Sequence, residues 1–285
     1  MLLKKYNLIL LLIFFSTGCS PLKIADVLSP YSGYEVTTNV PYGTLERQKL
    51  DIYRPTKSQN TKDIIIFIYG GSWKSGEKSD YRFIAQPFSE NGFITVIPNY
   101  RLYPEVRFPD FNKDVAKAVA WVHRNLSNST GPKNIVLVGH SAGAHIAALI
   151  SLDPKYLKAE GLSPSIIKTW VSLAGPLAFN PLKTSSTRPI FETIKDDIKQ
   201  AQPINFSRKN SRPAVLFHGK KDTTVYEKNS ILTAMALKKN ENKVIQKSFA
   251  SIGHIGLLLS IAKPDLFGVD LVKEITHSIS KLSEP

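Results

Sequence analysis

Cysteine is nearly absent from this sequence, since Cys19 is the only one among 285 residues. A lone cysteine excludes an intramolecular disulfide, so no covalent framework holds the fold. Long apolar runs are missing as well. The apolar run near the N-terminus covers only residues 8–15, whereas a helix needs about 20 residues to cross a bilayer. A permanent transmembrane span is therefore not expected.

Acidic residues are outnumbered by basic ones, 23 against 37, and the formal net charge is +14. The basic residues are scattered, without a run of five or more and without the interleaved aromatic residues of a nucleic-acid binder. This argues against nucleic acid as a partner and indicates a solvated basic surface that suits proximity to anionic lipid. With 42% hydrophobic and 21% charged residues, the composition is globular and excludes a disordered chain.

The first residues have the layout of a secretory signal: Lys4 and Lys5, then the apolar run, then small residues up to Gly18. Residues 15–19 resemble a bacterial lipobox, in which the cysteine receives a lipid and becomes the new N-terminus. Ser16 departs from the aliphatic residue that is usual in that motif. The resemblance implies a signal peptide at residues 1–18 and lipid attachment at Cys19. A free cysteine behind an ordinary signal is the alternative.

The residue after Cys19 is Ser20 and not Asp, which by resemblance to bacterial sorting rules implies the outer membrane, facing the periplasm. Residues 19–34 follow as a loosely structured tether that contains Pro21, Pro30 and Gly33. Residues 35–285 remain as one folded domain.

Strand-like and helical patterns alternate along this domain, which predicts an α/β fold with a mainly parallel sheet and helices on both faces. Apolar, β-branched runs predict strands at residues 50–53, 64–69, 93–98, 135–138, 167–173, 214–217 and 244–249. Helical patterns lie at residues 110–126, 141–152, 227–239 and 264–282. Four prolines interrupt the alternation at about residues 175–212, which predicts a small insertion there.

Residues 139–143 read Gly-His-Ser-Ala-Gly, a Gly-x-Ser-x-Gly motif that is weak on its own. Its context strengthens it, because an apolar strand enters the motif and a helical pattern leaves it. In such a turn the glycines leave room for a strained backbone, and the helix N-terminus favours developing negative charge. Ser141 is therefore the predicted nucleophile, and an ordinary strand-to-helix turn is the alternative.

A serine hydroxyl needs a base to take its proton, and the sequence offers six histidines. In the order Ser, acid, His that goes with this motif, only His254 and His277 follow a plausible acid. His254 lies in a glycine-flanked loop after a strand, which predicts the base, whereas His277 lies among charged residues of a helical pattern. Asp222 follows the next-to-last strand and is the predicted acid, with a structural turn aspartate as the alternative.

Glycines at positions 70 and 71 end the strand at residues 64–69, where they let backbone amides turn toward a ligand. The N–H groups of Gly71, Ser72 and Ala142 are the candidates for binding an oxyanion. A plain strand-to-loop turn is the alternative.

Taken together, these segments resemble the α/β-hydrolase superfamily. Within it they are similar to the bacterial esterases related to hormone-sensitive lipase, to acetylxylan or feruloyl esterase-like enzymes and to kynurenine formamidases. The matching pieces are residues 70–73, 98–104, 108–109 and 139–143, together with Asp114, Asp222 and His254. Tyr69 is a departure, because this family usually has His there. The resemblance also implies that Tyr100, Arg101 and Asp114 support the fold.

The resemblance and the residues predict a serine carboxylesterase that acts on small, short-acyl esters through an acyl-enzyme and needs no metal or organic cofactor. Amide or formamide hydrolysis uses the same groups and is the enzymatic alternative. A catalytically silent, lipid-tethered binding module is the alternative from another class, against which the complete set of Ser141, Asp222 and His254 argues. The insertion at residues 175–212 is expected over the active site, and its polar composition favours short acyl chains. The sequence does not predict an oligomeric state.

Overall fold

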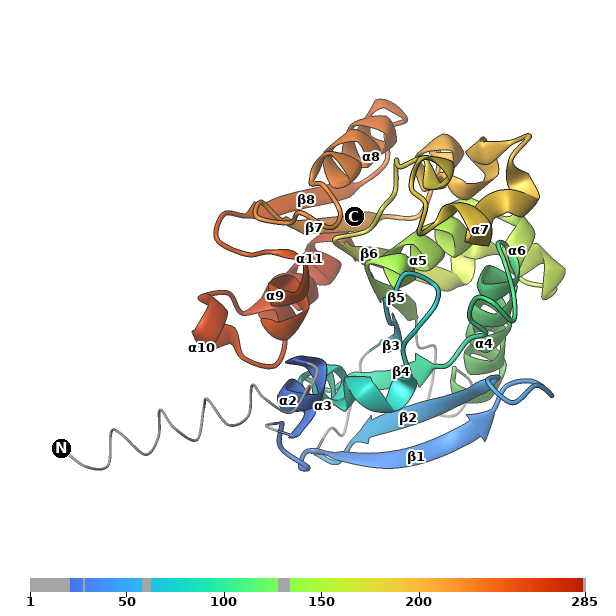
Figure 1. Cartoon of the computed structure of the whole chain (residues 1–285). Coiled ribbons are helices and arrows are strands. Elements are labelled where there is room, and N and C mark those ends of the chain that lie inside the picture. Colours follow the sequence, from blue (N-terminus) through green and yellow to red (C-terminus); the bar gives the residue numbers. More distant parts are fainter. Residues whose placement is uncertain (1–20, 28, 58–62, 128–133, 284–285) are drawn as a thin grey trace.

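The computed structural model describes residues 21–27, 29–57, 63–127 and 134–283 (Figure 1). Within these residues, an eight-stranded sheet has the order β1-β2-β4-β3-β5-β6-β7-β8. The β1–β2 and β2–β4 pairs are antiparallel, and the other neighbouring pairs are parallel. The strands are β1 (Tyr34–Pro41), β2 (Lys49–Pro55), β3 (Ile64–Ile68), β4 (Ile94–Pro98), β5 (Ile135–His140), β6 (Ile167–Leu173), β7 (Ala214–Gly219) and β8 (Val244–Phe249). The predicted α/β fold with a mainly parallel sheet is confirmed.

Helices cover both faces of this sheet (Figure 1). On one face lie α4 (Asp110–Leu126), α5 (Ala142–Leu152) and α6 (Lys155–Ala159), and on the other lie α3 (Arg82–Glu90) and α11 (Leu271–Ser283). The strands between them are therefore covered twice, and β3, β4, β5 and β7 are buried along their whole length. This explains why their sequences are continuous apolar runs and do not alternate with polar residues.

The carboxyl ends of the parallel strands lead into the loops that carry the predicted site residues. In an open α/β sheet, ligands bind outside these strand ends. Ser141 follows β5, and Asp222 lies shortly after β7. The remaining helices after β7 are α8 (Lys228–Lys239), α9 (His254–Leu259) and α10 (Pro264–Phe267).

Residues 175–212 connect β6 to β7 without a strand. They form the short helical turns η3 (Pro181–Lys183), α7 (Arg188–Phe191), η4 (Glu192–Ile194), η5 (Ile198–Ala201) and η6 (Pro203–Phe206). This segment packs beside α5 (Figure 1), where the ring of His145 is hydrogen-bonded through Nε2 to the carbonyl of Ala201 at 2.7 Å. The insertion thus lies next to the first turn of the helix that follows Ser141.

Part of the predicted tether is helical and packed. Residues Pro21–Val27 form α2, in which Ala25 is buried and the Asp26 carboxylate lies 3.4 Å from Arg82 Nε. The prediction of a loose segment at residues 19–34 is therefore corrected for α2, because these two contacts fix it to the domain. Cys19 and the predicted signal peptide at residues 1–18 lie outside the described residues.

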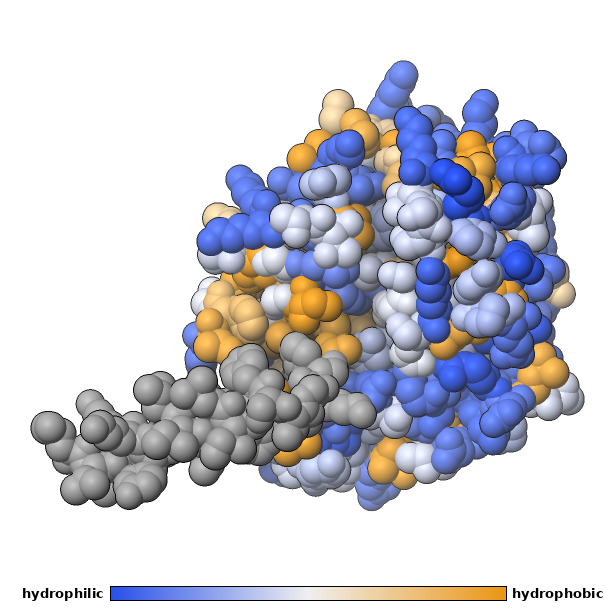
Figure 2. Space-filling view, in the orientation of Figure 1, coloured by the Kyte–Doolittle hydropathy of each residue, from blue (hydrophilic) through white to orange (hydrophobic). Residues whose placement is uncertain are grey.

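Two further differences concern regular structure. The sequence patterns predict neither β1 nor α3, although both are present. The predicted helix at residues 264–282 is two helices, because Gly268 takes a left-handed backbone conformation (φ 64°) and ends α10. Among the described residues, no helix is both long and apolar enough to span a membrane. Figure 2 shows hydrophilic residues over most of the visible face, with apolar residues in small groups between them.

Candidate active site

Ser141 occupies the sharp turn between β5 and α5. Its backbone is left-handed (φ 54°, ψ −121°), a conformation that persists only where the surroundings impose it. The Ser141 N–H donates to the carbonyl of Leu173 at 2.9 Å, and the Ser141 carbonyl accepts from the N–H groups of Ala144 and His145 at 3.0 and 3.1 Å. The turn is thus fastened to β6 on one side and to α5 on the other.

Two glycines make this turn sterically possible. A Cβ atom on Gly143 would lie 2.0 Å from the carbonyl oxygen of Ile68, and one on Gly139 would lie 2.4 Å from the carbonyl oxygen of Gly143. No side chain fits at either position. The Gly-x-Ser-x-Gly motif is therefore a packing requirement, since the start of α5 lies directly on the end of β3.

Asp222 and His254 are in direct contact. Asp222 Oδ2 accepts a hydrogen bond from His254 Nδ1 at 2.6 Å, and the Asp222 side chain is fully buried. Because a carboxylate only accepts, the Nδ1 atom carries the ring proton, and the neutral imidazole offers Nε2 as an acceptor. The sequence predicts a loop around His254, whereas the structure has it as the first residue of α9, directly after Gly253.

The Asp222 carboxylate is held by several donors at once. Its Oδ1 atom accepts from the N–H groups of Thr224 and Val225 at 2.9 and 2.8 Å, and its Oδ2 atom lies 3.3 Å from His218 Nε2. Burial alone would raise the pKa of Asp222. The hydrogen bonds from His218, His254 and Val225 outweigh that effect and hold the pKa of this carboxyl well below its usual range. The group is therefore a carboxylate at neutral pH.

His218 is a site residue that sequence reasoning missed. It is fully buried at the end of β7, where its Nδ1 atom accepts from the Ser230 hydroxyl and its Nε2 atom donates to the Val225 carbonyl, both at 2.7 Å. The rule that the histidine follows the acid removes His218 from consideration as a base. Its spacing of four residues from Asp222 is the one signal that could have pointed to this contact.

His140 links the serine turn to the segment that carries His254. Its Nε2 atom lies 3.2 Å from the carbonyl oxygen of His254, and the two rings are 4.7 Å apart between centroids. Burial, with a smaller contribution from His254, lowers the pKa of His140 to about 3, so its ring is neutral. Since His140 directly precedes Ser141, this contact places His254 against the residue that leads into the serine turn.

The predicted oxyanion donors come from two segments that meet at Ser141. A Cβ atom on Gly70 would lie 3.0 Å from the Ser141 Cβ atom, so the loop after β3 runs against the serine turn. Ala142 is the first residue of α5, where helical N–H groups have no partner within the helix. Among the described residues, no hydrogen bond uses the N–H of Gly71, Ser72 or Ala142. These three N–H groups therefore have no protein acceptor among the described residues.

The loop that follows β3 has an unusual backbone. Gly71, Ser72 and Trp73 all have positive φ values, 115°, 52° and 58°. The Gly71 carbonyl accepts from the N–H groups of Lys74 and Ser75 at 3.0 and 3.1 Å. The carbonyl side of this turn is therefore satisfied internally, which leaves its N–H groups free to point elsewhere.

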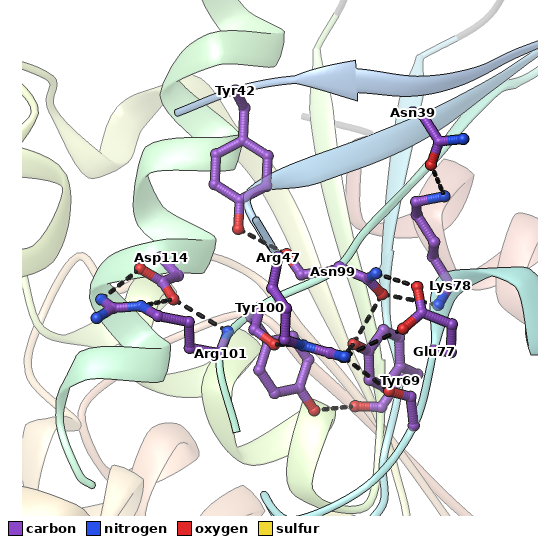
Figure 3. A network of polar contacts seen from close by, with 11 residues as sticks. Asn39, Tyr42, Arg47, Tyr69, Glu77, Lys78, Asn99, Tyr100, Arg101 and Asp114 are labelled. Atoms are coloured by element: carbon purple, nitrogen blue, oxygen red, sulfur yellow. Dashed lines mark hydrogen bonds and ion pairs between the residues drawn. The ribbon is translucent and has the colours of Figure 1, made fainter. Parts of the chain in front are cut away.

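Tyr69, which stands where His is usual in the family that the sequence resembles, lies in a buried polar network (Figure 3). Its hydroxyl donates to Asn99 Oδ1 and accepts from Arg47 Nη2, each at 3.0 Å. Burial raises the pKa of Tyr69, so the hydroxyl keeps its proton. Its carbonyl accepts from the Tyr100 hydroxyl at 2.9 Å, and the two rings stack 4.7 Å apart. Tyr69 therefore anchors the start of the loop.

Arg101 and Asp114 form a paired ion bridge beside this network. Arg101 Nε lies 2.8 Å from Asp114 Oδ2, and its Nη2 atom lies 2.8 Å from Asp114 Oδ1. Gln48 Nε2 donates to the same carboxylate at 2.9 Å. These contacts join the residue before β2, α4 and the chain after β4, which agrees with the structural role that the resemblance implies for Arg101, Asp114 and Tyr100.

An aromatic cluster surrounds Trp73, in the middle of the loop after β3. The Trp73 ring stacks on Phe179 at 5.8 Å and meets Phe191 edge to face at 4.9 Å, and Phe108 stacks on Phe191 at 5.3 Å. Phe179 and Phe191 belong to the segment at residues 175–212. The insertion therefore contacts the loop after β3 through aromatic rings, despite its polar composition.

His277 is exposed on α11, as its helical pattern predicts. In the part of the chain that the structure describes, no group of three or more His, Cys, Asp or Glu residues is arranged to hold a metal ion.

Comparisons with known proteins agree with this fold. The model of the BD-FAE family matches residues 50–237, more than half of the chain. The isoprenylcysteine alpha-carbonyl methylesterase of Arabidopsis thaliana is 27% identical over 212 residues, which cover 67% of this chain and 50% of the relative. A kynurenine formamidase of Salmo salar is 36% identical over 112 residues, 39% of this chain and 37% of the relative.

Among solved structures, esterase B from Lactobacillus rhamnosis superposes with a TM-score of 0.74 at 17% identity, over 99% of this chain and 97% of that one. This similarity shows a shared fold. The chain spans about half the length of the curated relatives that it matches.

Proposed function

Because the chain belongs to the BD-FAE family and has the α/β-hydrolase fold, we propose that it is a serine carboxylesterase that hydrolyses short-acyl esters of small molecules. The observation that carries the proposal is the 2.6 Å hydrogen bond between Asp222 and His254 beside the strained turn of Ser141. A buried carboxylate, an oriented imidazole and a half-buried serine in a strained turn are the parts that acyl transfer needs.

In the acylation step, Ser141 Oγ attacks the ester carbonyl carbon while His254 Nε2 takes the hydroxyl proton. The resulting imidazolium is stabilised by the Asp222 carboxylate, which already accepts from Nδ1. Collapse of the tetrahedral intermediate breaks the bond to the alkoxy oxygen, which leaves as the alcohol with the proton from His254. The acyl group remains on Ser141.

In the deacylation step, a water molecule attacks the acyl-enzyme while His254 again takes a proton. Collapse then releases the carboxylic acid and returns the proton to Ser141. Both tetrahedral intermediates carry an oxyanion, for which the N–H groups of Gly71, Ser72 and Ala142 are the proposed donors. Preorganised donors of this kind contribute about 10²- to 10³-fold each to kcat. No step requires a metal or an organic cofactor.

The preference for short acyl groups is supported by the aromatic cluster. Trp73 lies in the loop that carries two of the proposed oxyanion donors, and its ring stacks on Phe179 and meets Phe191 edge to face. Rings occupy the space beside this loop where a long acyl chain would need an open apolar channel. Acetyl to about butyryl esters are therefore the proposed substrates.

Amide hydrolysis is the second candidate, and the similarity to a kynurenine formamidase over part of the chain favours it. The same residues would serve, with His254 protonating a leaving nitrogen. A side-by-side assay of p-nitrophenyl acetate and an N-formyl aniline separates the two. An ester-to-amide ratio of kcat/KM above one supports the carboxylesterase, and the reverse ratio supports the formamidase.

Labelling with a fluorophosphonate probe tests the mechanism. Wild-type protein should bind one probe per chain on Ser141, as peptide mass spectrometry would locate it. Ser141→Ala should lose labelling and ester turnover, down to the about 10³- to 10⁴-fold over water that the remaining site supplies. A folded Ser141→Ala variant with wild-type activity contradicts the proposal, and a wild-type protein without labelling supports a catalytically silent binding module.

We also propose that the chain is exported and attached through a lipid on Cys19 to the bacterial outer membrane, facing the periplasm. The layout of residues 1–19 supports this, and the net charge of +14 suits a surface that lies near anionic lipid.

A further inference from the structure

We propose that Arg47 is a positioning residue that holds the oxyanion loop, defined as residues 69–77, in the shape that presents its N–H donors to the substrate. This role rests on the proposed function. Arg47 lies in the connection between β1 and β2 and has no place in the motifs that identify the site. Figure 3 shows its guanidinium pointing toward Tyr69 and Glu77.

The Arg47 guanidinium joins the two ends of the oxyanion loop. Its Nη2 atom donates to the Tyr69 hydroxyl at 3.0 Å at the start of the loop, and to the Gly76 carbonyl at 2.8 Å near its end. Its Nη1 atom lies 3.1 Å from Glu77 Oε2, also at the end. One planar guanidinium thus links both ends of the loop. Its donors have a fixed geometry that the single ammonium group of a lysine cannot reproduce.

The same side chain ties the loop to the sheet. Arg47 Nε donates to the carbonyl of Tyr100 at 2.8 Å, just after β4. Asn99 strengthens this attachment, because its Oδ1 atom accepts from the Tyr69 hydroxyl at 3.0 Å and from the Lys78 N–H at 2.8 Å, and its amide donates to Glu77. The loop ends are therefore fixed relative to the strands, and so relative to Ser141.

The backbone between these ends needs such a restraint. Gly71, Ser72 and Trp73 have successive positive φ values, and two of them are not glycine. Conformations of this kind are unfavourable and persist only where the surrounding structure over-determines them. Gly76 also has φ 115°, and a Cβ atom there would lie 2.6 Å from the Tyr69 ring. Gly76, near the end of the loop, therefore packs directly against Tyr69, whose hydroxyl binds Arg47.

Without the Arg47 fork, the two ends lose their common partner and the strained turn can relax. Gly71 and Ser72 carry the proposed donors, whereas Ala142 belongs to α5 and is unaffected. The loss should fall on the tetrahedral transition state, because these donors bind the oxyanion more strongly than the ground-state carbonyl. A reduced kcat with an almost unchanged KM is the expected signature.

The test is Arg47→Met, with Arg47→Lys as the conservative variant and Arg54→Met as the matched control. Arg54 lies on β2 and donates to Thr37 on β1, away from the loop. For p-nitrophenyl acetate, Arg47→Met should lower kcat by about 10- to 100-fold, less than removal of a donor itself, with KM within about threefold. An arylboronic acid, which forms a tetrahedral adduct on serine, should bind more weakly by a similar factor. The kcat of Arg47→Lys should lie between those of the wild type and Arg47→Met, and Arg54→Met should match the wild type.

Active-site titration with the fluorophosphonate separates a positioning role from a loss of folded protein. The proposal is overturned if kcat per titrated site in Arg47→Met stays within about twofold of the wild type, or if KM in Arg47→Met changes by as large a factor as kcat. Should Arg47→Met fail to fold, Tyr69→Phe removes only the hydroxyl that Arg47 binds. It should lower kcat about 3- to 10-fold at constant KM, and an unchanged kcat overturns the role.

A wild-type chain without Ser141-dependent turnover overturns the proposed function itself, whereas an active wild type with an unaffected Arg47→Met overturns the Arg47 role alone.

Discussion

Replacing Asp222 with Asn tests the arrangement of the site most directly. The two carboxylate oxygens have different partners: Oδ1 accepts from the N–H groups of Thr224 and Val225 at 2.9 and 2.8 Å, and Oδ2 accepts from His254 Nδ1 at 2.6 Å. Because two backbone N–H groups donate to the Oδ1 position, the Asn side chain must place its oxygen there. The amide nitrogen of Asn must therefore take the place of Oδ2, where it faces a ring N–H.

This conflict is relieved when His254 moves its proton from Nδ1 to Nε2. In that tautomer Nε2 is a donor and cannot take the proton of Ser141. His218 Nε2, which lies 3.3 Å from Oδ2, is a second donor that faces the same position and adds to the mismatch. In a serine triad, this change from acid to amide lowers kcat about 10⁴-fold with the geometry intact. We expect a loss of about 10³- to 10⁴-fold for p-nitrophenyl acetate.

The assay compares kcat, KM and the rate of fluorophosphonate labelling in the wild type and in Asp222→Asn. Both kcat and the labelling rate should fall together, since both depend on the nucleophilicity of Ser141. Asp265→Asn, an exposed carboxylate at the start of α10, is the control for the lost charge and should behave as the wild type. A kcat within about tenfold of the wild type, in an Asp222→Asn protein with a cooperative unfolding transition, would refute the tautomer argument.

The remaining predictions concern acid stability and membrane attachment. Burial above all lowers the pKa values of His140 and His145 from 6.5 to about 3 and about 4, so the unfolded chain binds protons that the folded chain does not. The free energy of unfolding should be at its full value above pH 6.5 and fall as the pH decreases toward 4, by up to about 1.4 kcal/mol per pH unit for each histidine. His145→Gln should flatten this slope in urea unfolding, and an unchanged slope contradicts the assignment. A wild-type chain made in a bacterium should incorporate clickable palmitate and fractionate with membranes, whereas Cys19→Ala should do neither. Unlabelled, soluble wild-type protein would exclude lipid attachment and point to Ser16 as the cause.

Sequence reasoning predicts best the elements that form because of residues adjacent to one another in the chain. Strand β5, the turn at Ser141 and α5 follow one another in a single stretch, and apolar run, glycines and helical pattern are all visible there. Strand β1 has no such signal. Its residues read Tyr-Glu-Val-Thr-Thr-Asn-Val-Pro and are mostly exposed, so no apolar alternation marks them. Antiparallel pairing with β2 alone makes this segment a strand.

The polar support of the site escapes sequence reasoning for a related reason. Arg47 contacts Tyr69, Gly76, Glu77 and Tyr100, which are 22 to 53 residues away in the chain. An arginine in a turn is ordinarily solvated, and only the folded sheet brings these acceptors to it. The resemblance marks Tyr69 as a departure from the family. The side chain that binds its hydroxyl is Arg47, which lies in the connection between β1 and β2 and is not part of any motif. A rule based on motif order can therefore name the reacting groups without naming what holds them.

The proposed preference for short acyl chains rests on one more long-range contact, the stack of Phe179 on Trp73. The rings lie 5.8 Å apart and nearly parallel at 7°, and Phe179 is only half-buried, so its truncation should disturb the core less than loss of the fully buried Phe191. Phe179→Ala opens apolar surface beside the oxyanion loop. Each acyl methylene that enters this space contributes about 0.8 kcal/mol, a factor of about four in kcat/KM. The ratio of octanoyl to butyryl hydrolysis should therefore rise at least about fourfold in a p-nitrophenyl ester series.

Phe206→Ala is the matched control for this truncation, because Phe206 belongs to the same insertion but packs near Lys155 and lies outside the aromatic cluster. It should leave the chain-length profile unchanged. The wild type should show its highest kcat/KM between acetyl and butyryl, since the ring of Phe179 occupies the space that longer chains need. A wild-type profile that rises steadily to dodecanoyl would rule out the short-acyl assignment. A Phe179→Ala profile equal to that of Phe206→Ala would show that this ring does not limit the acyl chain.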